Sequence, residues 1–405
     1  MSLGGAFNLL FSDSVTSSGS GSGKSYLTDF FPYMSTGSGK PMHYKTSLKL
    51  SAVYNAVDQI SNDIAKIPFR VYQELEGSRV RLKHHPADRI ISLAPNLYMT
   101  SFVERKMMMV SFLLRGNALS IISTSSSGFP ETTTYVPWDD VIDIRLVNGD
   151  LLYDIKGYDR PFLSSEVLHF KNFSLNGIVG VSVITYAAMQ LDLAIEVQQF
   201  SATNFANKAV SKGVVEAEKQ VGADAKKAII AGVKTALADK SPDRVTVLDE
   251  GMKWKAITIS PKDLEIIEQQ RFGVEDIARW FNISLHKIKS LHQSTNNNIE
   301  QQSLDHVADT IQPHVTNWEQ EYAKKLLTEK ELLDSTYVRG NMNVLLRADI
   351  KSRGEYYSRA INFGWMNRNN VRELEDYDKG PAMLDEYLTP ANTLTEEQIA
   401  KQLKE

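Results

Sequence analysis

The sequence predicts an α+β fold, with a mixed body of helices and short strands followed by long helices that bracket a small insert. Between residues 46 and 173, helical stretches alternate with short runs of β-branched and aromatic residues. After Gly180 the pattern is helical through about residue 210, and a further helical stretch begins at Pro261. Helices and strands that share a core in this way are typical of the α+β class.

The first strong helix is predicted over 50–67. Its apolar residues recur every three or four positions and therefore lie on one face; they are Val53, Val57, Ile60, Ile64 and Ile67. Pro68 ends this helix, because proline cannot donate the next backbone hydrogen bond. The stretch FRVYQ at 69–73 alternates as a strand does.

The second helix of the body is predicted from Ser101 to about Leu114. Ser101 and Glu104 have the spacing of a capping box, and Gly116-Asn117 ends the helix. The stretch ALSIIS at 118–123 then predicts a strand, and residues 130–173 predict a series of short strands.

The second half of the chain is predicted to be mostly helical. Residues 181–210 read as one long helix, and a helix from Pro261 to about Phe281 follows an insert over 211–260. Within the insert we expect a helix over 222–240 and a pair of strands over 244–260. A further long helix runs across Pro313, where a kink is expected.

The first 45 residues read as a flexible arm, because two Gly/Ser stretches occur within them. The sequence Gly23-Lys24-Ser25 ends as a phosphate-binding loop does. However, the position of the first glycine is occupied by Ser18, and no apolar strand precedes it. We therefore interpret this stretch as a tether. A nucleotide hydrolase that uses Lys24 and Ser25 remains the alternative.

Composition excludes several kinds of site. The chain has 405 residues and no cysteine, which rules out disulfides and cysteine-based metal sites or nucleophiles. The net charge of −4 argues against nucleic-acid binding through bulk positive charge. The weakly polar run 178–191 is shorter than the roughly 20 residues that span a membrane.

We expect no catalytic, metal or cofactor site. Four histidines lie close in sequence near Asp305 and Asp309; they are His286, His292, His306 and His314. A zinc pair on a helix needs ligands four residues apart, and His306 and His314 are eight apart.

At this point the sequence resembles the portal proteins of long-tailed bacteriophages, the head-to-tail connectors. Seven stretches match motifs of that family in the same order: SAVYNAVDQISNDIAKIPFRVYQ, HHPADRIISLAPN, LLRGNAL, EVLHFKNFSLNGIVGVSVI, IARWFNIS, NNNIEQQSLDHVADTIQPHV and GWMNRNNVRELE. Together they run from about Ser51 to Tyr377. No one motif decides, but seven in order are specific.

The resemblance implies a portal fold that assembles into a ring, with an architecture that can be written onto this chain. It would comprise a flexible arm (1–45), an α/β wing (46–180), a first stem helix (181–210), a clip (211–260), a second stem helix (261–281), a tunnel loop (282–298), a long kinked helix with its return to the wing (299–344), and a helical crown with a polar tail (345–405).

The resemblance also implies partners and a place in the virion. Portal proteins form a ring of about a dozen subunits at one capsid vertex, with double-stranded DNA passing through it independently of sequence. The implied partners are the terminase motor, head-tail adaptors, and the major capsid and scaffolding proteins, with assembly in the host cytoplasm. A structural or adaptor protein that is not a portal is the other alternative.

The resemblance also implies two sets of site residues. The channel-facing loop would present His286, Lys287, Lys289, His292, Ser294, Thr295 and Asn296. It holds basic and polar residues and no acid, so its weak phosphate contacts would repeat around a ring. Partner docking on the clip would use Lys226, Lys227 and Lys234.

Overall fold

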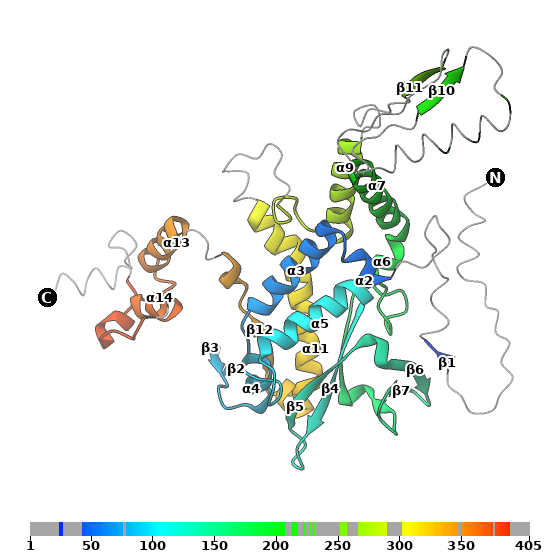
Figure 1. The fold of residues 1–405 in the computed structure, drawn as a ribbon. Coiled ribbons are helices and arrows are strands. Elements are labelled where there is room, and N and C mark those ends of the chain that lie inside the picture. The colour runs from blue at the N-terminus through cyan, green and yellow to red at the C-terminus, as the bar shows by residue number, and fades with distance from the viewer. Residues whose placement is uncertain are drawn as a thin grey trace, which may run out of the picture.

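The computed structural model describes residues 24–26, 43–75, 78–206, 213–217, 222, 227, 231, 252–256, 266–289, 302–346, 350–375 and 377–388. Figure 1 shows a body of helices and strands from which α7 (Ala188–Ala206) and α9 (Ile266–Trp280) project as a pair. The strands β10 (Gly213–Ala217) and β11 (Met252–Ala256) lie beyond this pair. The predicted α+β class is confirmed.

The body contains three sheets. In chain order their strands are β1 (Lys24–Ser25), β2 (Phe69–Leu75), β3 (Ser78–Arg81), β4 (Asn117–Thr124), β5 (Pro130–Val136), β6 (Val141–Val147), β7 (Asp150–Ile155), β8 (Phe162–Leu163), β9 (Val167–Lys171) and β12 (Thr336–Gly340). The sheet orders are β12-β2-β3, β5-β4-β9 and β1-β6-β7-β8, and every described pairing is antiparallel.

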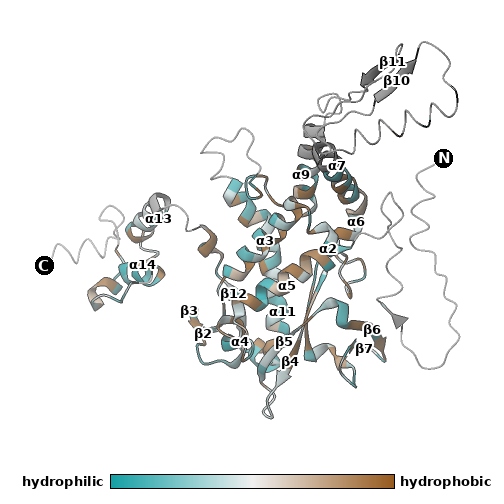
Figure 2. Ribbon diagram, viewed as in Figure 1, coloured by the Kyte–Doolittle hydropathy of each residue, from teal (hydrophilic) through white to brown (hydrophobic). Residues whose placement is uncertain are grey.

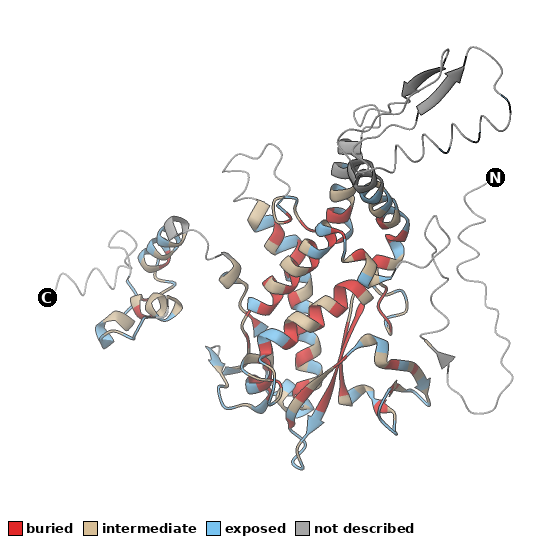
Figure 3. Ribbon diagram, in the orientation of Figure 1, coloured by how far each residue is buried: buried red, intermediate tan, exposed pale blue. Residues whose placement is uncertain are grey.

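The helices of the body cover these sheets. They are α2 (Tyr44–Ser47), α3 (Ser51–Lys66), α4 (Pro86–Ser92), α5 (Ser101–Arg115), α6 (Val183–Tyr186), α11 (Gln312–Leu326) and α12 (Glu329–Leu333). Buried residues run along α3, α5 and β4 (Figure 3). The five apolar residues predicted for the first helix are all buried, so that prediction is confirmed.

An aromatic cluster joins α11 to the strands of the body. The Trp318 ring on α11 stacks on Phe170 of β9 at 4.2 Å between centroids, and Tyr322 meets Phe69 of β2 edge-on at 5.7 Å. Burial of rings this large is a major stabilising contribution. The chain then returns as β12, which pairs with β2. The strand β12 was not predicted from the sequence, although a return of the chain to the wing was expected.

Helix α5 begins differently from the prediction. Its N-cap is Thr100, whose hydroxyl accepts a hydrogen bond from the Val103 amide at 3.4 Å. The hydroxyl of Ser101 donates to the Ile90 carbonyl, and Glu104 is buried and accepts from Thr133 at 2.8 Å. The predicted capping box is therefore wrong, because tertiary partners take both side chains. The predicted end is confirmed, since Gly116 caps the helix in the left-handed conformation.

The helix predicted over 181–210 is broken. Ala187, with φ −83° and ψ 5°, separates α6 from α7. The break lets α6 pack on α5 while α7 packs on α9. Ile184 before the break, and Ala188 and Leu191 after it, are all buried.

The strand β11 pairs with β10, in the register Gly213 to Ala256. The prediction paired two strands within 244–260, so it found β11 and missed the described partner, β10. Residues 244–250 and most of the predicted insert helix lie outside the described residues.

A kink was predicted where the long helix crosses Pro313, and the structure has an irregular turn just before that residue. A π-helical turn spans His306–Ile311, and the regular helix α11 resumes at Gln312 with Pro313 in its first turn. The segment 345–405, expected to be helical, contains α13 (Ile350–Asn362) and α14 (Arg368–Leu374).

Candidate functional site

The candidate site is the loop that follows α9, together with the π-helical turn that faces its root. After Trp280 the chain reverses at Asn282, which has φ +49°. The Asn282 amide donates to the Arg279 carbonyl at 3.1 Å, and the Ile283 amide donates to the Ala278 carbonyl at 2.9 Å. These bonds close the C-terminus of α9 in the manner of a left-handed cap.

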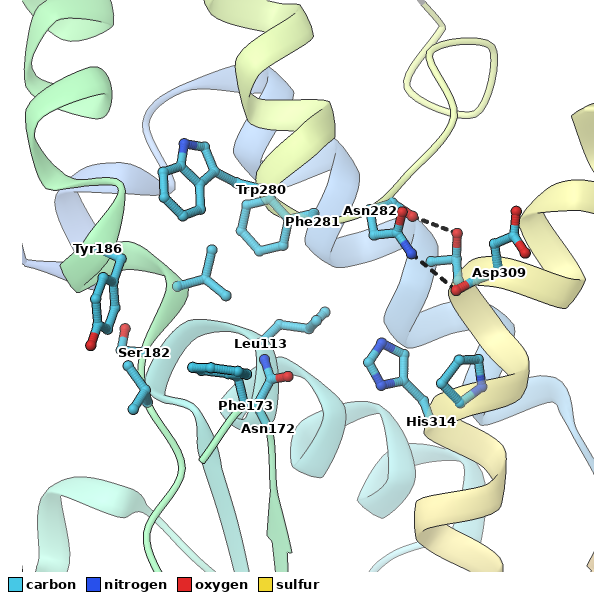
Figure 4. A pocket seen from close by; sticks show the side chains of 14 residues that line it. Leu113, Asn172, Phe173, Ser182, Tyr186, Trp280, Phe281, Asn282, Asp309 and His314 are labelled. Carbon is cyan, nitrogen blue, oxygen red and sulfur yellow. Dashed lines mark hydrogen bonds between the residues drawn. The ribbon is translucent and has the colours of Figure 1, made fainter. Parts of the chain in front are cut away.

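Asn282 also ties α9 to the π-helical turn. Its side-chain amide donates to the Asp309 carbonyl at 3.0 Å, and the Thr310 hydroxyl donates to the Asn282 carbonyl (Figure 4). Asp309 stands four residues before Pro313, which has no N–H to offer its carbonyl. The Asn282 side chain therefore satisfies an acceptor that the proline leaves open.

A buried hydrogen bond fixes the same turn to α3. The His306 Nε2 lies 3.2 Å from the Asp63 Oδ2, and both side chains are almost fully buried. Burial would raise the pKa of Asp63, but hydrogen bonds from His306 and Gln59 and the nearby Lys66 hold it below the usual value. Asp63 thus stays ionised and keeps His306 in place.

The described start of the loop carries the predicted basic residues. Ile288 is buried, Lys287 beside it is half-buried, and Lys289 is exposed with φ +59°. Burial, followed by the charge of Lys287, lowers the pKa of His286. At neutral pH the positive charge of this described stretch therefore comes from the two lysines.

Other predicted site residues fall outside the description or away from this loop. His292, Ser294, Thr295 and Asn296 lie outside the described residues, as do Lys226 and Lys234. Lys227 is described, helical and exposed. The structure does not test whether these residues contact DNA or a partner.

The alternative phosphate loop has the wrong setting. Lys24 and Ser25 form β1, which pairs antiparallel with Leu146 and Arg145 at the edge of a sheet. A phosphate loop must instead connect a buried strand to a helix N-terminus. The geometry therefore disfavours the hydrolase that would use these two residues.

The histidines do not assemble into a metal site in the described part of the chain. His306 contacts Asp63, whereas His314 packs edge-on against Phe112 at 5.2 Å. No group of three or more potential ligands lies together among the described residues. In the same part of the chain, no helix is both long and apolar enough to cross a bilayer.

Sequence reasoning missed the residues that anchor the loop. Asn282, Thr310 and Asp63 were not singled out. One signal was available: asparagine tolerates the left-handed conformation that ends a helix, and Asn282 directly follows the predicted helix.

The chain matches the family model described as phage portal protein over residues 51–376. The chain belongs to this family. It is 26% identical to the portal protein of Enterobacteria phage HK97 over 340 residues, covering 81% of this chain and 79% of that one. It is also 26% identical to the probable portal protein of Streptomyces phage phiC31 over 376 residues, with 88% and 80% covered.

Solved structures share the portal fold. An HK97-family portal protein from Corynebacterium diphtheriae aligns with a TM-score of 0.57 and 17% identity, covering 75% of this chain and 96% of that one. The neck of a native gene transfer agent particle, computed with C12 symmetry, aligns with a TM-score of 0.55 and 17% identity, with 89% and 97% covered. Relatives of this chain are thus named as phage portal proteins, and the same fold occurs in the neck of a gene transfer agent particle.

Proposed function

We propose that the chain forms the ring-shaped channel at a capsid vertex through which double-stranded DNA is packaged and later ejected. The observation that carries this proposal is the family match across 51–376, which includes the body, α7, α9 and the loop between α9 and α11. Ring symmetry in the neck assemblies that share the fold supports assembly into a ring.

Each region of the portal architecture is then assigned to a segment of this chain. The body over 46–180 is the wing, α7 and α9 lie in the two stem regions 181–210 and 261–281, and the insert 211–260 is the clip. The clip lysines Lys226, Lys227 and Lys234 dock the terminase motor and the head-tail adaptors. Residues 299–344 join the channel loop back to the wing, and residues 345–405 form the crown and tail.

The loop 282–298 is the element that meets DNA. Its lysines supply weak, sequence-independent phosphate contacts, and a ring repeats each contact around the duplex. The Asn282 hydrogen bonds and the Asp63–His306 pair support this role, because they hold the root of the loop against the body. ATP hydrolysis belongs to the partner motor.

Electron microscopy of the purified full-length protein tests the proposal. We expect closed rings with a central channel, of about a dozen subunits, under capsid-assembly conditions. A monomer whose sedimentation does not change with concentration, even in the presence of capsid and scaffolding proteins, would contradict it. Reversing the charge of the three clip lysines should weaken terminase binding while rings still form.

A further inference from the structure

The described part of the N-terminal arm adds a short strand to the wing. The strand β1 pairs antiparallel with the outer edge of β6, in the register Lys24 to Leu146. The Tyr26 amide continues this pairing and donates to the Ile144 carbonyl at 3.0 Å. Among the described strands, β1 is the only one that lies along this edge of β6 (Figure 1).

Tyr26 anchors the added strand. Its partly buried side chain packs against a buried apolar cluster of the wing that includes Ile144, Tyr153 and Phe162. Backbone pairing along an edge together with a side chain set into an apolar cluster is how strand addition binds an extended segment. The contact is therefore specific in register and not only a surface encounter.

The strand β6 has the composition of a strand that needs a neighbour. Its sequence VIDIRLV has five aliphatic residues, and hydrophobic segments are visible along it in Figure 2. Ile142 and Leu146 are 65% and 40% exposed. An apolar edge strand that is left open is a template for pairing with another chain.

The two charged side chains of β6 are engaged within its own sheet. Arg145 pairs with Asp154 of β7 at 2.6 Å, and Asp143 accepts from the Ile144 amide at 2.8 Å. Charges can protect an edge strand when they oppose an incoming strand, but these two have local partners. At Ile144 the carbonyl is the group that remains for a neighbour, and the Tyr26 amide satisfies it.

A second contact fixes the arm to the same region of the wing. The Tyr44 hydroxyl donates to the Asp139 Oδ2 at 3.1 Å, and the Arg115 guanidinium lies 4.3 Å from the centre of the Tyr44 ring. Asp139 comes two residues before β6 begins at Val141. The chain between Tyr26 and Tyr44 therefore joins two neighbouring points of the wing. Such tethering gives an effective concentration on the order of millimolar, which favours the chain's own arm as the occupant of the edge.

We propose that the outer edge of β6 is a strand-addition site, and that residues 24–26 of the same chain fill it as a cover. The cover satisfies backbone groups of the edge and shields its apolar residues, so free subunits do not pair with one another through β6. It acts in single subunits before any ring forms, and it lies outside the proposed channel. The Gly23-Lys24-Ser25 stretch then has a structural role in place of phosphate binding.

Disulfide trapping in the full-length protein tests the register, because the chain has no native cysteine. Lys24→Cys with Leu146→Cys should form a disulfide within one chain when dissociated subunits are mildly oxidised, because opposite Cα atoms of an antiparallel pair lie about 4.5–5.5 Å apart. The matched control is Lys24→Cys with Ile142→Cys, which places the second cysteine about 13 Å further along the same strand. Mass spectrometry of the linked peptides should find the disulfide in the first variant and not in the control.

Each other result of this experiment overturns the proposal. Equal oxidation of the two variants would show that the arm meets the edge without a register. A disulfide found only between chains would show that the occupant belongs to another copy. No disulfide in either variant would show that residues 24–26 do not lie on β6.

Removal of the anchor tests what the cover does. Tyr26→Asp should make hydrogen exchange over 141–147 at least about tenfold faster, because the edge loses its partner. In sedimentation, Tyr26→Asp should also associate with rising concentration under conditions that keep the parent dissociated. Tyr26→Phe keeps the ring and should behave like the parent. Addition of Ile142→Lys to Tyr26→Asp should abolish the association, because a lysine on an edge strand opposes pairing.

Two outcomes of the second experiment contradict the cover. If Tyr26→Asp stays as dissociated as the parent, the edge does not need a cover. If Ile142→Lys does not suppress the association, the subunits associate through another surface. Ring formation is measured separately by electron microscopy. Failure of the parent itself to form rings contradicts the proposed function and leaves both tests of the cover valid.

Discussion

At the scale of single residues, Gly116 and Gly180 explain how two motifs that are far apart in the sequence meet in the fold. The Asn117 side chain donates to the Gly180 carbonyl at 2.7 Å and accepts from the Gly180 amide at 2.7 Å. A Cβ on Gly180 would lie 2.0 Å from the Gly116 carbonyl oxygen. The Gly116-Asn117 turn and the glycine before α6 are therefore two halves of one close backbone contact.

Gly180→Ala should destabilise the body strongly. The clash is with backbone, which cannot rotate away, so we expect a loss of about 2–4 kcal/mol in the free energy of unfolding. Urea unfolding followed by tryptophan fluorescence measures it. Gly354→Ala in α13 is the matched control, because a Cβ there meets nothing within 4 Å. The prediction fails if the two variants have equal unfolding midpoints.

His314 should make the folded state sensitive to mild acid. Burial lowers its pKa from 6.5 to about 4. Below pH 6.5 the unfolded chain therefore binds a proton that the folded chain does not, and stability falls as the pH drops toward 4. We expect a loss on the order of 2 kcal/mol across that window. His314→Gln should flatten the dependence there.

Asp63 provides the contrast. Its folded pKa lies below 3.8, so its contribution to stability is lost only as the pH falls through that lower value. The pH dependence that Asp63 contributes should therefore lie below the window between pH 6.5 and 4. An identical pH profile for His314→Gln and the parent would show that His314 does not cause the acid sensitivity.

At the scale of elements, the sequence pattern predicted those helices and helix ends that depend only on residues nearby in the chain. The helices at α3 and α5, and the end of α5 at Gly116, follow from periodicity and glycine conformation. The start of α5 and the break at Ala187 do not, because they depend on partners far away in sequence: Ser101 bonds to the Ile90 carbonyl, and α6 packs on α5. The strand β12 was missed because its register is set by β2, more than two hundred residues earlier.

The connection between α9 and the π-helical turn shows the same limit. Pro313 in the sequence predicts a freed carbonyl at Asp309, but only the fold brings Asn282 to it. Asn282→Gly keeps the left-handed turn and removes the amide, so it should cost about 1 kcal/mol and loosen the turn. Hydrogen exchange measured on peptides covering 302–316 should be faster in the variant.

Asn148→Gly is the control for that experiment. Asn148 also has a positive φ, of 53°, but it lies in the exposed turn between β6 and β7. It should leave exchange over 302–316 at the parent rate. If Asn282→Gly also leaves that rate unchanged, the side-chain bond to Asp309 does not hold the turn.

At the scale of the whole molecule, the fold class and the family could be predicted from the sequence, whereas the residues that anchor the loop after α9 could not. The order of the motifs is visible in the sequence itself, and the family match over 51–376 confirms the resemblance that this order indicated. The buried Asp63–His306 pair joins positions 243 apart in sequence. No local sequence pattern indicates such a pair, because each residue alone is typical of the exposed face of a helix.

The proposal that residues 282–298 face the DNA is tested most directly by replacing the two lysines of this loop. Lys287→Ala with Lys289→Ala should leave ring assembly and incorporation into proheads normal, since Ile288 between them still anchors the loop. Packaging should start, but DNA retention should fall, because in the proposed ring each lost phosphate contact is repeated in every subunit. Replacing both lysines with Glu should be worse, since repulsion then opposes entry of the duplex. DNA protected from nuclease per assembled particle measures both effects.

Lys83→Ala with Lys156→Ala, two exposed lysines of the wing, is the matched control and should package like the parent. If the loop doubles also package and retain full-length DNA, residues 282–298 do not face the DNA and the channel lies along another element.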